Sequence, residues 1–362
     1  MTLGEVETPA LLVDRRALDA NIASLAAWLA DRAPSVRLRP HAKTHKSPDI
    51  ARLQIAAGAV GVCCQTVGEA EAMVAAGVAD VLLSNQVADA AKAARLAALA
   101  HAARVSVCVD DAMQVALLDA AAAQAGTSLH ILVEVDVGGG RCGVPSAEAA
   151  LALAEAVAGC GSLKLEGLQA YHGRAQHLRT DAERRDAISA ASAIAGAAMQ
   201  RIRGAGLPCK TITGAGTGTF ELEAHGGLYT ELQCGSYVFM DADYARNLPG
   251  AISDVPKFAH ALTVLTTVIS VPRPERIVCD AGLKAMSLDS GPPSLALHPG
   301  LDYAGPSDEH STLRAAPGIS IRPGDRLQFI PGHCDPTVAM HDWIVVHEDG
   351  TVRELWPVAR AW

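Results

Sequence analysis

The sequence lacks the features of membrane, secreted and nucleic-acid-binding proteins. No apolar run approaches the roughly 20 residues that a membrane-spanning helix needs. The opening stretch MTLGEVETPALLVD carries charges where a signal peptide has its apolar core. Acidic residues outnumber basic ones by 39 to 30, and there is no basic run, which argues against nucleic acid as the main partner. We therefore expect a cytoplasmic protein that acts on a small molecule.

The cysteine pattern argues against a disulfide framework and does not support a structural zinc ribbon. The nine cysteines are odd in number, include no CxxC pair, and in part lie within apolar stretches such as VGVCCQ and VSVCVD. Such positions are typical of buried free thiols in a reducing compartment. We expect thiols that pack in the core.

Apolar and helix-forming residues are abundant and regularly arranged. Of the 362 residues, 50% are hydrophobic and 19% are charged, enough for a large core. Eight apolar runs alternate with alanine-rich helical segments, most of which end in glycine. This alternation favours a (β/α)8 barrel over an open doubly wound sheet. The runs are SVRLRP, AVGVCCQ, DVLLSN, RVSVCVD, LHILVEVDV, LEGLQAYHG, CKTITG and YTELQCGSY.

The pattern changes at about residue 246, where alternating β-prone runs replace the helices. One of them, HEDGTVREL, contains the Asp-Gly pair that is typical of a tight hairpin. We predict an α/β fold with a barrel over residues 14–245 and an antiparallel β domain over 246–362. Residues 1–13, with the strand-like TPALLVD, either join the β domain or open the barrel.

The chemistry of a barrel gathers at the carboxyl ends of its strands. After the first run comes HAKTHK, with Lys43 and Lys46, which is either a solvated basic loop or a covalent cofactor anchor. The turns TGAGTGT and QCGSY follow the seventh and eighth runs, where barrels commonly bind phosphate through backbone N–H groups. With Arg141 between lysine and turns, this set suits pyridoxal phosphate.

A second candidate site lies in the β domain, in the stretch GHCDP. His333 and Asp335 are two positions apart, so in an extended chain their side chains leave the same face and Cys334 leaves the other. Two protein ligands suit an open, catalytic metal site. Cys334 as a soft ligand beside His333 is the alternative.

Taken together, a set of motifs in this order resembles the D-threonine aldolases, which are pyridoxal-phosphate enzymes of the alanine-racemase-like fold type. The resemblance covers nearly the whole chain, and 3-hydroxy-D-aspartate aldolase and eukaryotic-type D-serine dehydratase share much of the pattern. The motifs are TPALLVD, RPHAKTHKS, GVCCQTVGEAE, VEVDVGGGRCGV, GLQAYHG with QHLRT, TITGAGTG, YTELQCGSYVFMDADY, DAGLKAMSLDSG, SDEH and PGHCDPT with HDW.

The resemblance implies a role for each candidate residue. Lys43 carries the cofactor as a Schiff base, with Lys46 as the alternative anchor. His177 lies beside the substrate's β-hydroxyl and accepts its proton, whereas His172 is structural. The other contacts to the cofactor are Arg141 at the phenolic oxygen, Gln65 near the ring, Tyr171 along the ring, and Thr217, Gly235, Ser236 and Tyr244 on the phosphate side.

The same resemblance puts a divalent ion on His333 and Asp335. Related D-serine dehydratases have cysteine in place of Asp335 and bind zinc, and a carboxylate instead favours Mn²⁺, with Mg²⁺ or Ca²⁺ as alternatives. This aspartate favours retro-aldol cleavage of D-threonine to glycine and acetaldehyde. Dehydration of D-serine or 3-hydroxyaspartate, racemisation, and a non-catalytic cofactor-binding module remain alternatives. A homodimer is expected.

The sequence does not decide which side chain the preferred substrate carries. The chain reads TVAMHDW where relatives more often show an asparagine and a leucine before HDW. Arg174 lies near the proposed site and would favour a second carboxylate, as in 3-hydroxy-D-aspartate.

Overall fold

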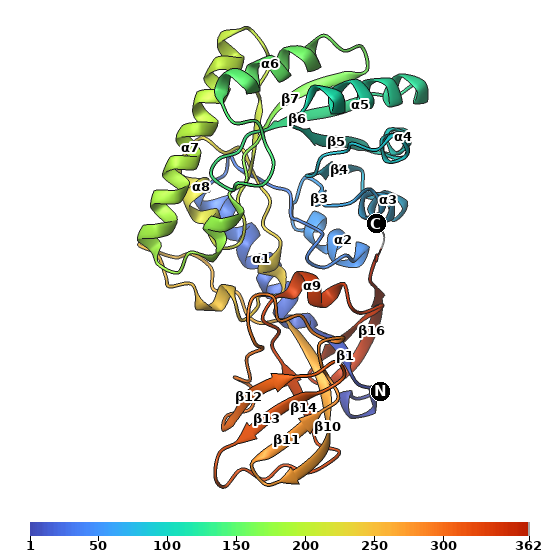
Figure 1. Cartoon of the computed structure of the whole chain (residues 1–362), viewed down its shortest axis with the longest axis vertical. Coiled ribbons are helices and arrows are strands. Elements are labelled where there is room, and N and C mark those ends of the chain that lie inside the picture. The colour runs from blue at the N-terminus through green and yellow to red at the C-terminus, as the bar shows by residue number, and fades with distance from the viewer. Residues whose placement is uncertain (361–362) are drawn as a thin grey trace.

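The computed structural model describes residues 1–360, which form two parts stacked along the long axis of the molecule (Figure 1). The larger part is a barrel of parallel strands with helices outside it, and the smaller part is a mostly antiparallel sheet. The predicted fold class is therefore confirmed. Within the described residues, no helix is both long and apolar enough to cross a membrane.

All eight predicted barrel strands are present and run parallel. Their order around the sheet is β2-β9-β8-β7-β6-β5-β4-β3. Two hydrogen bonds just beyond β2 close the ring onto β3, from Ala42 N to Cys63 O at 2.7 Å and from Cys63 N to Pro40 O at 2.8 Å. The strands are β2 (Arg37–Leu38), β3 (Val62–Cys64), β4 (Asp80–Leu83), β5 (Arg104–Val109), β6 (Leu129–Glu134), β7 (Leu163–Gln169), β8 (Thr211–Gly214) and β9 (Glu231–Leu232).

Successive residues of each barrel strand pack on opposite faces, which explains the continuous apolar runs. Cys63, Leu82, Cys108 and Leu132 form a buried cluster of their own, separate from the neighbours that pack against the helices. The thiols thus fill space as small apolar groups. None of the nine cysteines, all within residues 1–360, forms a disulfide, and seven of them are buried.

Helices cover the outside of the barrel, and polar side chains cap their amino ends. Asp14, Thr66, Asp89, Ser146 and Thr180 each accept a hydrogen bond from a backbone N–H of the first turn. The helices are α1 (Arg15–Arg32), α2 (Pro48–Ala56), α3 (Val67–Ala75), α4 (Ala90–Leu99), α5 (Ala112–Ala125), α6 (Ala147–Ala158), α7 (Asp181–Gly204) and α8 (Phe220–His225), with the 3-10 turns η2 (Gly173–His177), η3 (Ser236–Val238) and η4 (Tyr244–Arg246).

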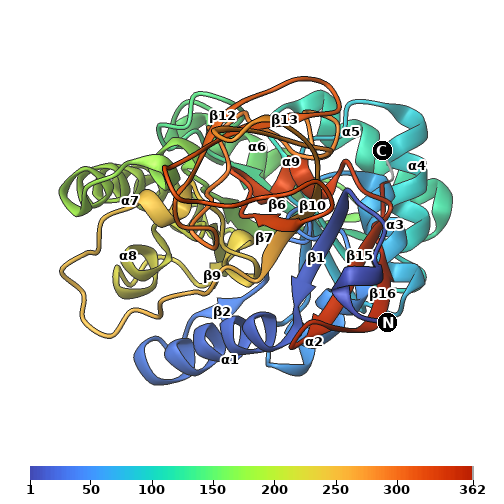
Figure 2. The ribbon, with the colours of Figure 1, turned by 90° about the horizontal axis from the view of Figure 1, so that it is seen from below.

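The second sheet takes one strand from the start of the chain. β1 lies between β10 and β15, antiparallel to the first and parallel to the second (Figure 2). The Asp-Gly pair makes the predicted hairpin between β15 and β16, with both Asp349 and Gly350 at positive φ. The elements are η1 (Leu3–Glu5), β1 (Ala10–Asp14), β10 (Leu262–Arg273), β11 (Arg276–Cys279), β12 (Leu301–Pro306), β13 (Ser311–Ala315), β14 (Arg326–Phe329), α9 (Cys334–Val338), β15 (Trp343–Glu348) and β16 (Thr351–Pro357).

A buried charge network at the amino end of the barrel fixes the strand that leads to HAKTHK. Arg39 is 4% exposed, and it donates to Glu231 at 2.9 Å and to Asp80 at 2.7 Å. It therefore ties β2 to the first residues of β9 and β4. Arg37, two positions earlier, lies half-exposed at 3.5 Å from the same Glu231.

We predict that Arg39→Ala lowers the free energy of unfolding by about 3–5 kcal/mol, because the buried Glu231 then loses its buried partner and keeps only the half-exposed Arg37 at 3.5 Å. Urea denaturation of the purified protein measures this loss. Arg37→Ala is the matched control, and its half-exposed ion pair is expected to contribute less than about 1 kcal/mol. Equal losses in the two variants would contradict the role given to the buried network.

Candidate active site

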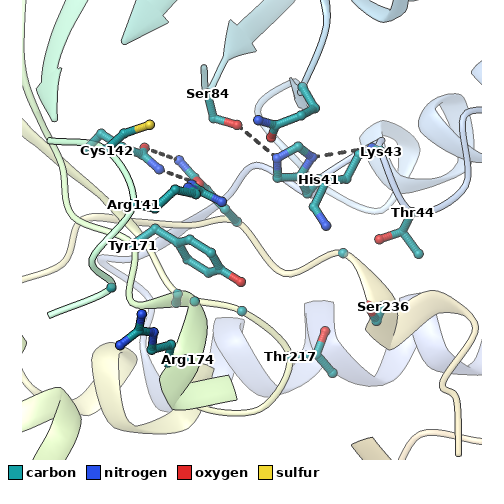
Figure 3. A pocket seen from close by; sticks show the side chains of 18 of the residues that line it. His41, Lys43, Thr44, Ser84, Arg141, Cys142, Tyr171, Arg174, Thr217 and Ser236 are labelled. Atoms are coloured by element: carbon teal, nitrogen blue, oxygen red, sulfur yellow. Dashed lines mark hydrogen bonds between the residues drawn. The ribbon is translucent and has the colours of Figure 1, made fainter. Parts of the chain in front are cut away.

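The carboxyl ends of the barrel strands surround a cavity of about 370 Å³. This volume is within the usual range for small-molecule sites. All nine predicted barrel residues line it, so residues far apart in the sequence meet at one place (Figure 3). They are Lys43, Gln65, Arg141, Tyr171, His177, Thr217, Gly235, Ser236 and Tyr244.

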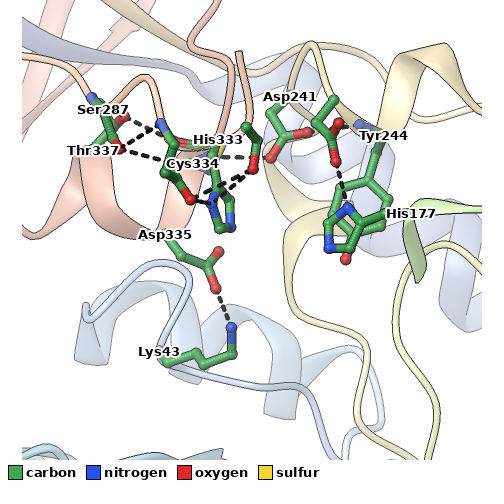
Figure 4. Close-up of polar contacts among 12 residues, drawn as sticks. Lys43, His177, Asp241, Tyr244, Ser287, His333, Cys334, Asp335 and Thr337 are labelled. Carbon is green, nitrogen blue, oxygen red and sulfur yellow. Dashed lines mark hydrogen bonds and ion pairs between the residues drawn. The ribbon is translucent and has the colours of Figure 1, made fainter. Parts of the chain in front are cut away.

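The HAKTHK stretch is not a solvated loop. His41, Thr44 and His45 are buried. Lys43 extends into the cavity, where its ammonium group pairs with Asp335 of the β domain (Figure 4). Lys46, the alternative anchor, has positive φ and pairs with the buried Glu69. The turn therefore directs one lysine into the cavity and the other to the start of α3.

Charges around Lys43 set the protonation of its neighbours. Burial acts to lower the pKa of Lys43, but the adjacent Asp335 outweighs this and raises it. Burial acts to raise the pKa of Asp335, and Lys43 and His333 hold it well below its usual value. Burial and the Lys43 charge lower the pKa of His41 far below its usual value, so its ring is neutral. His41 Nε2 lies 2.9 Å from Ser84 Oγ.

Two glycine-containing turns form one wall of the cavity. A Cβ at Gly216 would lie 2.5 Å from Gln176 Oε1, and one at Gly235 would lie 2.5 Å from Thr44 Oγ1. A side chain at either position would have to displace one of these polar groups, so glycine lets the two turns lie close to Gln176 and Thr44. Thr217 Oγ accepts a hydrogen bond from Tyr237 N at 3.0 Å, which joins the first turn to η3 of the second. The wall presents backbone N–H groups and hydroxyls, which suit a phosphate.

Arg141 and Tyr171 lie together on another side of the cavity. The Arg141 guanidinium is 5.9 Å from the centre of the Tyr171 ring. The loop that carries Arg141 is shaped by Asp136, whose carboxylate accepts from Gly138 N and Gly140 N at 3.0 Å each. Both glycines have positive φ, which explains two of the three glycines before Arg141. Burial raises the pKa of the Tyr171 hydroxyl, so it keeps its proton.

His177 projects from η2 at the rim of the same cavity. Its side chain is 44% exposed, and its Nδ1 lies 2.5 Å from Asp243 Oδ2. Its ring packs against that of Tyr244, with centres 5.6 Å apart. His172 instead caps η2, since its Nδ1 accepts from Ala175 N. Asp243 lies in the motif YTELQCGSYVFMDADY but is not among the site residues predicted from the sequence.

His333 and Asp335 lie in the β domain, where Asp335 reaches Lys43 of the cavity, but the two are not on one extended strand. His333 has extended backbone, whereas Asp335 lies in the first turn of α9, so the predicted extended conformation through Asp335 is wrong. The two side chains nevertheless face each other (Figure 4). Cys334 is buried, with Sγ 3.7 Å from Met240 O, on the side away from the pair. Asp289, whose Oδ2 lies 2.8 Å from His333 Nδ1, is not among the site residues predicted from the sequence.

The residues fit both groups that the sequence predicts. Asp335 Oδ1 is buried and has no hydrogen-bond partner in the described chain. With Nδ1 turned to Asp289, His333 leaves Nε2 for a cation. Within residues 1–360 no group of three or more histidine, cysteine or acidic side chains has metal-binding geometry, so a cation here would complete its coordination with water or substrate. Lys43 would serve as the anchor for pyridoxal phosphate, and the glycine turns would serve as the cradle for its phosphate.

Comparison with known proteins assigns both parts of the chain to families. Residues 13–243 match the family model "Alanine racemase, N-terminal domain", and residues 261–347 match "Putative serine dehydratase domain". D-threonine aldolase of an Arthrobacter species is 46% identical over 99% of this chain and 93% of its own length. A 3-hydroxy-D-aspartate aldolase of Paracoccus denitrificans is 43% identical with the same coverage.

Comparison with solved structures gives the same assignment. The crystal structure of D-threonine aldolase from Filomicrobium marinum superposes with a TM-score of 0.97 at 45% identity, covering 99% of this chain and 97% of that one. D-threo-3-hydroxyaspartate dehydratase of a Delftia species gives 0.86 at 28% identity over both whole chains. The chain therefore belongs to the alanine-racemase-like family, in the group of lyases that includes D-threonine aldolase.

Proposed function

We propose that the protein cleaves D-β-hydroxy-α-amino acids, with D-threonine giving glycine and acetaldehyde, and that it uses pyridoxal phosphate and a divalent cation. The observation that carries this proposal is the contact between Lys43 and Asp335. It brings a cofactor-anchoring lysine next to the His333–Asp335 pair. Bond cleavage beside the cofactor and activation of the neighbouring hydroxyl then occur within one cavity.

Pyridoxal phosphate would be held by Lys43 through Nζ, by Arg141 and Tyr171 along the ring, and by the two glycine turns at the phosphate. When bound, it supplies an electron sink for the pair released from the Cα–Cβ bond. Gln65 also lines the cavity, and its backbone carbonyl accepts a hydrogen bond from Asn85 Nδ2 at 3.1 Å. Thr217, Gly235, Ser236 and Tyr244 complete the phosphate side.

The cation would be held by His333 Nε2 and by Asp335. It supplies Lewis acidity that lowers the pKa of a hydroxyl at the substrate's β-carbon. The hard carboxylate of Asp335 favours Mn²⁺, with Mg²⁺ and Ca²⁺ as alternatives, over a thiolate-preferring metal. His177, at the rim of the cavity, presents its Nε2 to accept the hydroxyl proton.

We further propose that the protein works as a cytoplasmic homodimer. Free cysteines support a reducing compartment. The homodimer rests on the family resemblance.

The first experiment follows the products. Purified protein with Mn²⁺ is expected to release glycine and acetaldehyde from D-threonine and neither from L-threonine, and to lose this activity in chelator.

His333→Ala and Asp335→Ala should lower activity roughly 100-fold or more while the yellow cofactor stays bound. Cys334→Ala, which changes a thiol facing away from the pair, is the control. 2-Oxobutanoate and ammonia would make the enzyme a dehydratase, and full activity of either metal variant in chelator would exclude the cation.

The cofactor anchor is tested by a matched pair of lysine variants. Lys43→Arg keeps the charge beside Asp335 but cannot form a Schiff base, so we expect no covalent cofactor and no cleavage. Lys46→Arg keeps the ion pair with Glu69 and is expected to retain the cofactor. Borohydride reduction followed by peptide mass spectrometry locates the modified lysine. Modification at position 46 in the wild-type protein would overturn the assignment.

A second substrate, 3-hydroxy-D-aspartate, is favoured by one observation. Arg174 lines the cavity and forms no ion pair with a carboxylate of the described chain (Figure 3). A free guanidinium at this place suits a substrate with a second carboxylate. The Paracoccus relative at 43% identity carries this substrate in its name.

We expect Arg174→Gln to lower kcat/KM for 3-hydroxy-D-aspartate about 10- to 100-fold, the range for losing one hydrogen bond to a charged group. The kcat/KM for D-threonine serves as the internal control and should change much less. Steady-state assays of glycine release with both substrates measure the two values. A parallel fall for both substrates would show that Arg174 maintains the cavity rather than selecting the side chain.

A further inference from the structure

Asp243 is a buried carboxylate with three cationic or proton-donating partners at the rim of the cavity. Its side chain is 4% exposed. One oxygen, Oδ2, faces His177 Nδ1 at 2.5 Å. The other, Oδ1, accepts from Arg179 Nη2 and from Arg246 Nη2, each at 2.5 Å. The two oxygens therefore have different partners, and the carboxylate cannot turn without breaking three contacts.

The ionisation of Asp243 decides which nitrogen of His177 carries hydrogen. Burial acts to raise the pKa of Asp243, but the hydrogen bonds from Arg179, His177 and Arg246 lower it below its usual value. An ionised carboxylate only accepts hydrogen bonds. In the neutral imidazole, Nδ1 must therefore hold the proton, and Nε2 carries a lone pair.

Hydrogen bonds to several neighbouring segments hold Asp243 and its two arginine partners in place. Arg179 Nη1 also donates to Asn247 at 2.7 Å and to the Asp243 carbonyl at 2.8 Å. Arg246 donates to the Ser290 carbonyl at 2.6 Å, and Asp243 N donates to Gly332 O at 3.1 Å. Gly332 immediately precedes His333. The loop that carries Asp243 is thus tied to η2 on one side and to the predicted metal loop on the other.

We propose that Asp243 is a positioning residue that fixes His177 in the Nδ1–H form, so that Nε2 faces the cavity as a proton acceptor. Arg179 and Arg246 determine which carboxylate oxygen faces the ring. This inference rests on the proposed function, because it assigns His177 the β-hydroxyl proton. It adds a residue that acts through His177 and does not itself touch substrate.

The two arginines determine how an asparagine at position 243 would orient its amide group. In Asp243→Asn the amide oxygen is drawn to the two arginines, since both are donors only. The amide NH₂ then donates a hydrogen bond to His177 Nδ1. Since this nitrogen must act as the acceptor, it no longer carries a hydrogen. The hydrogen moves to Nε2, the atom that has to be free. In Asp243→Ala neither form is imposed on the ring.

We therefore expect the isosteric variant to be the worse enzyme. Asp243→Asn should lower kcat for D-threonine cleavage on the order of 1,000-fold, as expected when a catalytic histidine is held in the wrong tautomer, and Asp243→Ala should lower it less. A purely structural role predicts the opposite order, because asparagine preserves more contacts. Asp280→Asn is the control. Its carboxylate accepts from Thr266 and Thr267 in the β domain, outside the cavity.

Nitrogen NMR of the holoenzyme labelled with ¹⁵N-histidine gives a readout independent of activity. The His177 signals, identified by their loss in His177→Gln, should show hydrogen on Nδ1 in the wild type and on Nε2 in Asp243→Asn. The same tautomer in both proteins would overturn the proposal, and this comparison decides it even if Asp243→Ala does not fold.

A double variant separates this inference from the proposed function. In a His177→Gln background, Asp243→Asn should cause no further loss of kcat, because both substitutions affect one group. A large additional loss would show that Asp243 does not act through His177. If His177→Gln alone kept full activity, the proton-acceptor role in the proposed function would be wrong, while the NMR comparison would still test the tautomer.

Discussion

The ion pair between Lys43 and Asp335 is the contact on which the active site depends, because it crosses from the barrel to the β domain. Lys43 is fixed by the closed barrel, and Asp335 by α9 and its loop. Neither part of the chain contains both halves of the proposed chemistry. The two groups neutralise each other, and the Asp335 side chain is 12% exposed, so its charge would be costly without a partner. Correct docking of the two parts is therefore a condition for activity as well as for stability.

The two histidines at the cavity are held in the same way although they come from different parts of the chain. His177 Nδ1 contacts Asp243, and His333 Nδ1 contacts Asp289. In each case a carboxylate contacts Nδ1 and leaves Nε2 for another partner. One ring is proposed to accept a proton and the other to bind a cation. A carboxylate behind the ring serves both purposes, since it fixes orientation and tautomer together.

The sequence predicted the barrel and most of the cavity because these depend on local pattern. Eight apolar runs became eight strands, and residues after them met at one end. The acids behind the histidines were not predictable in this way, because Asp243 is 66 residues from His177 and Asp289 is 44 from His333. The short helix α9 was missed although Pro336 follows Asp335, and a proline fits the first turn of a helix. The GHCDP stretch was instead treated as a strand.

The position of β1 has a consequence for synthesis. Leu11, Leu12 and Val13 are fully buried between β10 and β15, so these apolar residues lack their first strand partner until β10 is made and their second until β15 is made. At usual rates of translation the wait for β15 is on the order of half a minute. During that time the barrel can close, but the second sheet cannot. The first strand made is thus among the last to be paired, and the nascent chain exposes an aggregation-prone segment near its beginning.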